Sequence, residues 1–546
     1  MSLDVLLINP PFRMVPPFKY TMIDPPRNLT IIAAWLEQQG ISVKIFDMGI
    51  LELPFEGVGP AIRREHPCIV GISNRCTYNF PMVRCVASEV KAIQPDIPVV
   101  VGGTYVSFAP VEALQTAPEI DYVVVGEGDI SGPELMRCLL DGGQPHEVRG
   151  IAFRDSQGEV VLTPSAEIIE DLDQVPFPAN HLLPIERYVE RQERYIISLT
   201  RGCPYHCEYC TSSFVRGRVR YRSVPNVMEE IRSAYDLGFR YFYFFDDIFT
   251  INKPLVMDLC EAICQSGMSF QWHCMTRAEL VDWELLVKMK EAGCDLIGYG
   301  VECVNVAVLK EMKRSSHKIR EAFRLTRKAG IRPLAFAMFG FPGNTFADEM
   351  ATIRYLIELQ PDVVRDFSFI PYPGTPHYAD PEGHGIHIFD YDFCHWSQLD
   401  EPIHRTDQIS EQEIIEARIV VNYLFRSKGT ISPGERYRRR RGAIVIKTGE
   451  GGVLYNPSPS PEKRKTDMYL NCIKLNEIYY EVLLRCDGYH NTEDTVHIIH
   501  KLFDMDESEA RQKVKEVIEE ANKVNLLEII PDFTRPNSEE KDVEQE

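Results

Sequence analysis

The most informative stretch of this chain is Arg201-Gly202-Cys203-Pro204-Tyr205-His206-Cys207-Glu208-Tyr209-Cys210. It holds three cysteines, Cys203, Cys207 and Cys210, in the spacing CxxxCxxC, directly after the apolar run 195–199. Three thiolates at this spacing can bind three irons of a cubane cluster and leave the fourth iron open, because no fourth cysteine stands nearby. Structural zinc and electron-carrier clusters usually have four protein ligands, so these two alternatives fit the set less well.

With this motif the chain resembles the radical S-adenosylmethionine enzymes over about residues 190 to 420. The resemblance implies a [4Fe-4S] cluster on Cys203, Cys207 and Cys210, whose open iron is chelated by the amino and carboxylate groups of S-adenosylmethionine. An electron from the cluster then cleaves this cofactor to a 5'-deoxyadenosyl radical, and a reducing electron donor is required. Tyr209 fits the family's aromatic residue before the last cysteine, against the adenine.

The segment from residue 191 to 430 alternates strands and helices. Strands are predicted near residues 195–199, 240–245, 269–275, 295–300, 332–339 and 364–370. Six such units indicate the partial (β/α)6 barrel typical of the family, with its active site at the carboxyl ends of the strands. Four residues in the region after the last strand, which could cover the substrate or simply pack, are Tyr372, His377, His395 and Trp396.

Polar residues follow several of these strands. Asp246 and Asp247 come after an aromatic strand, and Arg277 follows the next strand along the chain. By the resemblance, the two aspartates lie near the amino group of S-adenosylmethionine and Arg277 near its carboxylate. Glu302 matches the acidic residue that holds the ribose hydroxyls. For any one of these positions, a helix cap or a surface ion pair is the alternative.

Residues 1–150 predict a doubly wound parallel sheet. Strands are expected at residues 4–9, 43–46, 69–73, 98–101 and 122–125, each separated by a helix-length segment. Ligands of such sheets bind outside the carboxyl ends of the strands. The loops at these ends supply the candidate binding residues Asn9, Pro10, Asp47, Ser73, Asn74, Arg75, Gly102, Gly103, Thr104, Gly126, Glu127 and Gly128.

A flavodoxin-like domain ahead of a radical S-adenosylmethionine core resembles the cobalamin-binding domain of the cobalamin-dependent radical enzymes. The resemblance implies that these loops hold cobalamin. The motif DxHxxG, whose histidine coordinates cobalt in many cobalamin proteins, occurs nowhere in the chain. Cobalt is therefore expected to be bound without a histidine, or the domain has lost the cofactor. Arg75 could lie beneath the cobalt, and the alternative for the glycines is that they only make tight turns.

The remaining sequence divides into a connector, a small domain and a tail. Residues 151–190 are rich in proline and predict a linker that packs one domain over the other. Residues 431–530 predict a small winged-helix α+β domain, and residues 531–546 an acidic, disordered tail. The basic run 436–441 predicts a solvated linker, with docking of an acidic peptide as the alternative.

The small domain resembles a leader-peptide-recognition (PqqD-like) domain, on the run 475–477, the break at 486–488 and an acidic last helix. Three strands at 443–446, 452–455 and 472–475 and three helices at 476–486, 492–502 and 507–525 are expected. Such domains take a peptide as an added strand at a sheet edge. A structural winged helix that binds no peptide is the alternative.

Composition limits the partners. The 546 residues are too many for one compact core, and a formal net charge of -21 opposes a nucleic-acid or anionic-membrane role. No apolar run approaches the roughly 20 residues that span a bilayer, and the N-terminus has no signal-peptide pattern. The fifteen scattered cysteines indicate reduced thiols. We expect a cytoplasmic protein.

These resemblances together imply a cobalamin-dependent radical S-adenosylmethionine enzyme, which we expect to methylate an unactivated carbon of a ribosomally made peptide. In the mechanism that the resemblance implies, one S-adenosylmethionine methylates cobalamin and another gives the radical that removes hydrogen from the substrate. The substrate radical then takes the methyl group. Two alternatives stay open: a ring-forming or oxidising enzyme of the same cofactor class, and a methyltransferase of a small natural product.

Overall fold

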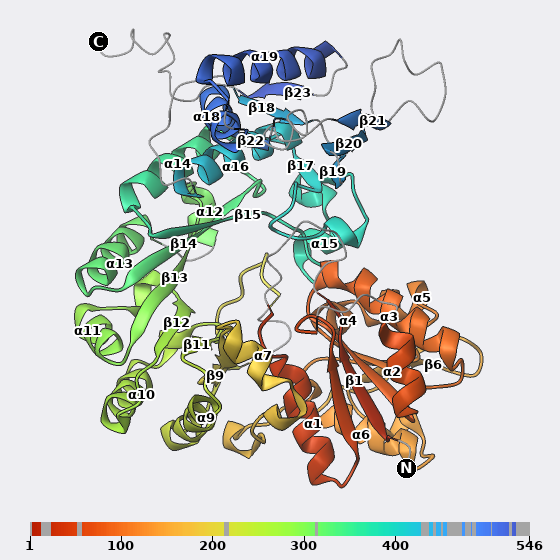
Figure 1. Cartoon of the computed structure of the whole chain (residues 1–546). Helices are drawn as coiled ribbons and strands as arrows, with labels where there is room; N and C mark the ends of the chain where they lie inside the picture. The colour runs from red at the N-terminus through yellow and green to blue at the C-terminus, as the bar shows by residue number, and fades with distance from the viewer. Residues whose placement is uncertain are drawn as a thin grey trace. The chain divides into compact units, whose positions relative to one another are not determined.

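The computed structural model describes residues 3–11, 23–51, 57–211, 218–311, 315–426, 436–439, 444–448, 451–455, 472–475, 482, 487–503, 505–523 and 527–530. By their contacts these residues form two compact units, Met1–Ile414 and Ile415–Glu546 (Figure 1). The predicted sheet domain and the predicted barrel both belong to the first unit. Among the described residues, no helix combines the length and the apolar character needed to cross a bilayer.

The N-terminal part of the first unit is built on a parallel sheet. Its five parallel strands are β1 (Val5–Asn9), β2 (Val43–Asp47), β3 (Ile69–Asn74), β4 (Val99–Gly103) and β5 (Tyr122–Val124). They pair in the order β2-β1-β3-β4-β5. This is the flavodoxin-like order, whose topological switch point lies between β1 and β3, so the predicted doubly wound sheet is confirmed.

Helices cover both faces of this sheet, which is why its strands read as continuous valine and isoleucine runs. One face carries α1 (Arg27–Gln38) and α6 (Gly128–Leu140), whose apolar residues share one core cluster. The other face carries α2 (Val58–Glu65), α3 (Phe80–Ile93), α4 (Thr104–Phe108) and α5 (Pro110–Thr116), which share a second cluster (Figure 1). Two separate cores thus hold the strand ends in place.

The connector is partly structural. Its first residues form β6 (Ile151–Arg154) and β7 (Val160–Leu162), which extend the sheet by two antiparallel strands. Its end forms the short helix α7 (Ile185–Glu190). Residues 151–162, which the sequence analysis gave to a linker, therefore belong to the sheet.

The second part of the first unit is an open parallel barrel. Its strands are β8 (Tyr195–Ile197), β11 (Tyr241–Phe244), β12 (Gln271–Thr276), β13 (Cys294–Glu302), β14 (Arg332–Phe339) and β15 (Val363–Ser368). They pair in sequence order, all parallel, with β8 and β15 at the two edges. The intervening helices are α9 (Val224–Asp236), α10 (Lys253–Ser266), α11 (Trp283–Glu291), α12 (Val306–Glu311), α13 (Ser316–Lys328) and α14 (Phe346–Leu359). The partial (β/α)6 barrel is confirmed.

A segment after the barrel, residues 376–406, is called the cover segment below. It contains α15 (Pro376–Ala379) and the antiparallel pair β16 (Ile386–Ile388) and β17 (His404–Thr406). It contacts the sheet domain, because the Tyr378 hydroxyl donates to Glu112 Oε2 at 3.4 Å and the Phe393 ring lies 5.1 Å from that of Tyr105.

Among the residues predicted to cover the substrate, Trp396 is fully buried and donates to the Asp390 carbonyl at 3.0 Å. Tyr372 packs against the same apolar cluster as Trp396, and the exposed His395 pairs with Asp390. For Trp396 and Tyr372 the packing alternative describes what the structure shows. His377 lies elsewhere, against the cysteine loop, as described below.

The second unit starts within α16 (Glu411–Arg426) and contains two three-stranded antiparallel sheets. One has the order β22 (Asp487–Asn491), β18 (Arg436–Arg439), β23 (Leu527–Ile530); the other β19 (Ile444–Thr448), β20 (Gly451–Tyr455), β21 (Cys472–Leu475). The helices α18 (Thr492–Leu502) and α19 (Glu507–Lys523) lie between β22 and β23 in the chain, close to the expected ranges.

One expectation for this unit was wrong. The basic run begins in a paired strand, β18, and not in a solvated linker, because β22 and β23 satisfy its backbone groups. The predicted helix 476–486, apart from residue 482, and the predicted tail 531–546 lie outside the described residues. The winged-helix assignment stays a prediction.

Candidate active site

The cysteine loop, residues 202–210, leaves the barrel directly after β8 and the two-residue strand β9 (Thr200–Arg201). Cys203, Cys207 and Cys210 are half-buried. Burial raises the pKa of the Cys203 thiol to about 11, so cluster assembly must displace a proton from it. Three thiols on one loop are a donor set that suits an iron–sulfur cluster with one open iron.

The predicted aspartates, Asp246 and Asp247, accept hydrogen bonds from residues at or just before the start of this loop. Asp246 is buried, and its carboxylate accepts hydrogen bonds from the Leu199 backbone N–H at 3.0 Å and the Thr200 hydroxyl at 2.7 Å. Burial raises the pKa of Asp246 to about 7, although these hydrogen bonds oppose the shift. Asp247 accepts from the Gly202 N–H at 3.2 Å. Both residues therefore position the cysteine loop, and their contact with S-adenosylmethionine stays a prediction.

Two further predicted residues lie against side chains of the same loop. The Arg277 guanidinium lies over the Tyr205 ring, 4.0 Å from its centroid. The Tyr209 hydroxyl donates to Glu302 Oε1 at 3.4 Å, so the residues expected at the adenine and the ribose are brought together. Glu302 also has a φ of +58°, which is uncommon for a residue with a side chain and is typical of functional sites.

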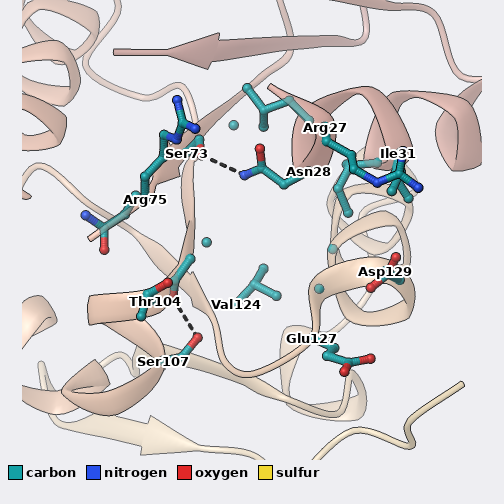
Figure 2. A pocket seen from close by; sticks show the side chains of 18 of the residues that line it. Arg27, Asn28, Ile31, Ser73, Arg75, Thr104, Ser107, Val124, Glu127 and Asp129 are labelled. Carbon is teal, nitrogen blue, oxygen red and sulfur yellow. Dashed lines mark hydrogen bonds between the residues drawn. The ribbon is translucent and has the colours of Figure 1, made fainter. Parts of the chain in front are cut away.

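A cavity of about 540 Å³ lies at the carboxyl ends of the sheet strands (Figure 2). The predicted residues that line it are Ser73, Asn74, Arg75, Gly102, Gly103, Thr104, Gly126, Glu127 and Gly128. The barrel supplies the opposite wall with Ile196, Ile197, Ser198, Thr200, Arg201, Thr211 and Phe245. Arg201 and Thr211 flank the cysteine loop on its two sides. The cavity therefore joins the sheet domain to the cluster site.

At the edge of the cavity, glycine residues allow a bound molecule to approach the backbone closely. At Gly103, φ is +137° and an added Cβ would lie 1.8 Å from the Asn74 carbonyl oxygen, so only glycine fits. The Ser107 hydroxyl donates to the Gly103 carbonyl at 2.6 Å, and Asn28 Nδ2 donates to Ser73 Oγ at 2.7 Å. A broad cavity with a glycine rim and both apolar and polar lining residues suits a large cofactor.

Three predicted residues, Asn9, Pro10 and Asp47, are not among those that line the cavity. Asn9 Nδ2 donates to Asp47 Oδ1 at 3.0 Å, and the Tyr188 hydroxyl of α7 donates to Oδ2 of the same carboxylate. Burial raises the pKa of Asp47. For Asp47 the physical reason is position, since β2 is the edge strand and the cavity lies at β1, β3, β4 and β5. Asn9 ends β1, but its amide is bound to the Asp47 carboxylate. Asp47 attaches the connector to the sheet.

Charged side chains join the two domains at this cavity, and of these the sequence had indicated only Glu127 as a site residue. Arg201 donates to the two Asp129 carboxylate oxygens at 2.8 and 3.1 Å and to Glu127 at 3.4 Å. Arg220, of the strand β10 (Arg220–Tyr221) that pairs with β9, donates to Glu127 at 3.1 Å. Opposite charges beside the cysteine motif and the glycine loop were the available signal, but only the domain packing pairs them.

A second charged group joins α1 to the barrel. Glu230 of α9 is buried, its Oε2 accepts from Arg27 Nη2 at 3.1 Å, and Arg222 Nη1 lies 2.7 Å from the same oxygen. Arg27 also donates to the Ile196 carbonyl at 3.3 Å. Burial alone would raise the pKa of Glu230, but the two guanidinium groups hold it below its usual value. Arg27 lines the cavity, so this group fixes one of its walls.

Comparison of the chain with known proteins identifies its family. The radical SAM superfamily matches residues 197–356, the B12 binding domain residues 19–135, and coenzyme PQQ synthesis protein D residues 452–527. An uncharacterized methyltransferase of Pyrococcus horikoshii is 30% identical over 378 residues, which are 68% of this chain and 82% of the relative. The chain belongs to the cobalamin-dependent radical S-adenosylmethionine methyltransferase family.

Two further similarities bear on its fold and chemistry. An anaerobic magnesium-protoporphyrin IX monomethyl ester cyclase of Synechocystis is 27% identical, over 69% of this chain and 76% of the relative. The methyltransferase TsrM of Kitasatospora setae, solved with cobalamin and a [4Fe-4S] cluster bound, superposes with a TM-score of 0.62 at 21% identity. That match covers 74% of this chain and 83% of TsrM, and it shows the shared fold.

The cofactors of this family are a [4Fe-4S] cluster, S-adenosylmethionine and cobalamin. The chain supplies a fitting site for each: three cysteines on one loop, polar groups at the barrel strand ends, and the cavity of the sheet domain. The assignment of individual residues to individual cofactors stays a prediction.

Proposed function

We propose that this enzyme transfers a methyl group to an unactivated carbon of a peptide. The observation that supports a transfer between two cofactors is the common wall of the cavity. Residues at the strand ends of the sheet domain face Arg201 and Thr211, the two residues beside the cysteine loop. A cobalamin on the sheet domain and a cluster on the loop would thus share one reaction space.

When bound, the cluster with S-adenosylmethionine supplies a hydrogen-abstracting radical, and cobalamin supplies the methyl group. The chain itself has to orient these groups and exclude water. Asp246 and Asp247 fix the cysteine loop through its backbone, and Arg201 ties the start of that loop to Asp129 beside the glycine rim. We assign Arg277 and Glu302 to S-adenosylmethionine, and Ser73, Gly102 and Gly126 with their neighbours to cobalamin.

A peptide substrate is supported by the match of residues 452–527 to coenzyme PQQ synthesis protein D. This match includes the outer strand β21 of the sheet β19-β20-β21. Among the described strands of that sheet, β19 and β21 each pair on one side only, and an added peptide strand at such an edge would gain backbone hydrogen bonds. We propose that the second unit binds a leader segment of the substrate.

A ring-forming or oxidising reaction is the second candidate. The similarity to the Synechocystis cyclase supports it, because that relative covers a comparable share of this chain. A small natural product is the alternative substrate if the second unit binds no peptide.

The test uses reduced, cobalamin-loaded enzyme with S-adenosylmethionine and candidate precursor peptides. Formation of deoxyadenosine and S-adenosylhomocysteine together with a peptide mass gain of one methyl group supports the proposal. Deoxyadenosine with a peptide that loses hydrogen points to the ring-forming or oxidising alternative. The control is a triple variant, Cys203→Ala, Cys207→Ala and Cys210→Ala, which should give no deoxyadenosine. Turnover by this variant would overturn the cluster assignment.

A further inference from the structure

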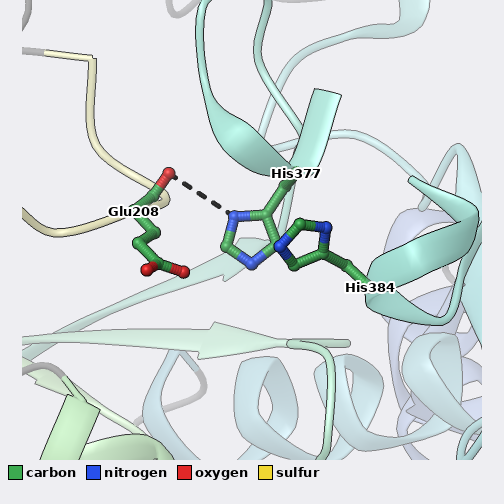
Figure 3. Close-up of side chains that lie close together, drawn as sticks. All are labelled: Glu208, His377 and His384. Atoms are coloured by element: carbon green, nitrogen blue, oxygen red, sulfur yellow. Dashed lines mark hydrogen bonds between the residues drawn. The ribbon is translucent and has the colours of Figure 1, made fainter. Parts of the chain in front are cut away.

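A group of metal-ligating side chains lies between the cysteine loop and the cover segment (Figure 3). It consists of Glu208, His377 and His384, whose ligand atoms all lie within 4.8 Å of one another. Glu208 stands on the cysteine loop, His377 on α15, and His384 in the turn that precedes β16. Residues from two segments that are far apart in the sequence therefore converge on one point.

The hydrogen bonds of the two imidazoles occupy Nδ1 and leave Nε2 of each ring available to bind a metal ion. His384 Nδ1 lies 2.7 Å from the Asp380 carbonyl oxygen, and His377 Nδ1 lies 3.4 Å from the Glu208 carbonyl oxygen. A carbonyl oxygen can only accept, so each Nδ1 carries the proton and each Nε2 keeps its lone pair. A backbone carbonyl on the second nitrogen is the usual arrangement around a metal-bound histidine.

We propose that Glu208, His377 and His384 bind a divalent transition-metal ion, and that this ion is zinc. Two imidazole nitrogens with one carboxylate oxygen are ligands that zinc accepts, and three protein ligands leave a fourth position open. No cysteine belongs to the set, so the site is distinct from the cluster site.

To bind zinc, the three side chains must come closer together, and they differ in how far they can move. Zinc–nitrogen bonds of about 2.0–2.1 Å require ligand atoms about 3.3 Å apart in a tetrahedron, closer than the 4.8 Å limit found here. His377 is buried and packs edge-on against Phe341 and Phe369, with ring centroids 5.7 and 5.3 Å away. Glu208 is exposed and His384 half-buried, so both can rotate toward this fixed ligand.

Occupation of the site would have a structural consequence for the cysteine loop. Glu208 stands between Cys207 and Tyr209, so an ion on its carboxylate would tie the loop to the cover segment. This effect adds to the backbone contact that His377 already makes with the loop. The inference does not rest on the proposed reaction or substrate.

In the experiment, the iron–sulfur cluster is first reconstituted anaerobically on Cys203, Cys207 and Cys210 of the full-length chain. Zinc is then added. Zinc is counted by mass spectrometry after gel filtration, and its ligands are read from zinc-edge X-ray absorption. About one zinc per chain with nitrogen and oxygen neighbours at about 2.0–2.1 Å is expected, without sulfur at about 2.3 Å. The sulfur distance separates this site from zinc bound by the cysteines.

Variants locate the ion. His377→Ala, His384→Ala and Glu208→Gln should each lower the zinc affinity at least about 100-fold, since even outer-shell changes cost 10–100-fold. The matched control is His387→Ala, whose imidazole pairs with Asp407 at 2.6 Å and lies outside the group. It should keep wild-type zinc binding. Iron content and circular dichroism verify that each variant folds.

Three results would overturn the proposal. They are a wild-type chain that retains no zinc above the buffer blank, zinc with sulfur neighbours, and unchanged zinc binding in both His384→Ala and Glu208→Gln. These two replaced residues are half-buried and exposed, so the test does not depend on whether His377→Ala folds.

Discussion

Replacing Glu230 by glutamine should loosen the sheet domain from the barrel and weaken cobalamin binding without changing the cavity lining. Glu230 is 1% exposed and lies between Arg27 of α1 and Arg222 of the barrel. Its removal would leave two guanidinium groups without their carboxylate. Breaking such a buried pair costs about 3–5 kcal/mol, and the similar shape of glutamine places the expected loss near about 3 kcal/mol.

This loss should appear in two measurements. Urea unfolding should show the free energy of unfolding lowered by about 3 kcal/mol. Cobalamin affinity, from titration with hydroxocobalamin, should fall between about tenfold and about 100-fold, since 1.4 kcal/mol corresponds to a factor of ten. The second effect arises because Arg27 and its neighbour Asn28 line the cavity that Glu230 helps to close.

The matched control is Glu229→Gln, the same change at the adjacent, exposed position of α9. It should leave both quantities nearly unchanged. A double-mutant cycle with Arg27→Gln should give a coupling energy above about 1 kcal/mol. If Glu230→Gln behaves like Glu229→Gln, or if the cycle gives no coupling, the idea that this group docks the two domains is wrong.

Three other outcomes follow from the same structure. Gly103→Ala should destabilise the chain by more than about 4 kcal/mol in urea unfolding because its Cβ would meet the Asn74 carbonyl, whereas Gly102→Ala, with its nearest neighbour at 3.5 Å, should fold. Burial raises the pKa of Glu349, a residue of α14, to about 8 from 4.5, so the folded chain holds an extra proton between these values. The stability should therefore fall by up to about 1.4 kcal/mol per pH unit from this group as the pH rises through that range. Glu349→Gln should make the fall smaller when unfolding is measured at pH 5, 6.5 and 8, while Asp246 still contributes a fall of the same sign, and an unchanged slope would contradict the assignment. Cys203→Ala should lose the iron–sulfur absorbance after reconstitution, whereas Cys264→Ala, an exposed free thiol, should keep it, and equal iron in both would exclude Cys203 as a ligand.

The strand positions of both cofactor domains could be predicted because their signal is local. Apolar runs such as 69–73 and 122–125 are buried on both faces of a parallel sheet, and each is bounded by a turn or a helix. The central strand β18 was missed for the opposite reason. Its arginine-rich sequence carries no apolar pattern, and it is a strand only because β22 and β23 pair with it from distant parts of the chain.

The candidate residues show the same division. Ser73, Gly102 and Gly126 were found because strand-end loops meet at one edge of a parallel sheet. Asp47 follows the same rule but ends an edge strand, where it bonds to Asn9 and Tyr188. Strand order is a long-range property, so this difference could not be predicted from the local sequence.

By itself, the sequence determined the cysteine motif that we propose as the cluster ligands, Cys203, Cys207 and Cys210, and the alternation of strands and helices, because both depend on residues close together in the chain. Only the tertiary structure decided which groups face each other across the domains. The pairs Arg201 with Asp129 and Arg27 with Glu230 join residues 72 and 203 positions apart. Their carboxylates and guanidinium groups leave water only when the two domains pack, and the energy that selects these partners arises at that step.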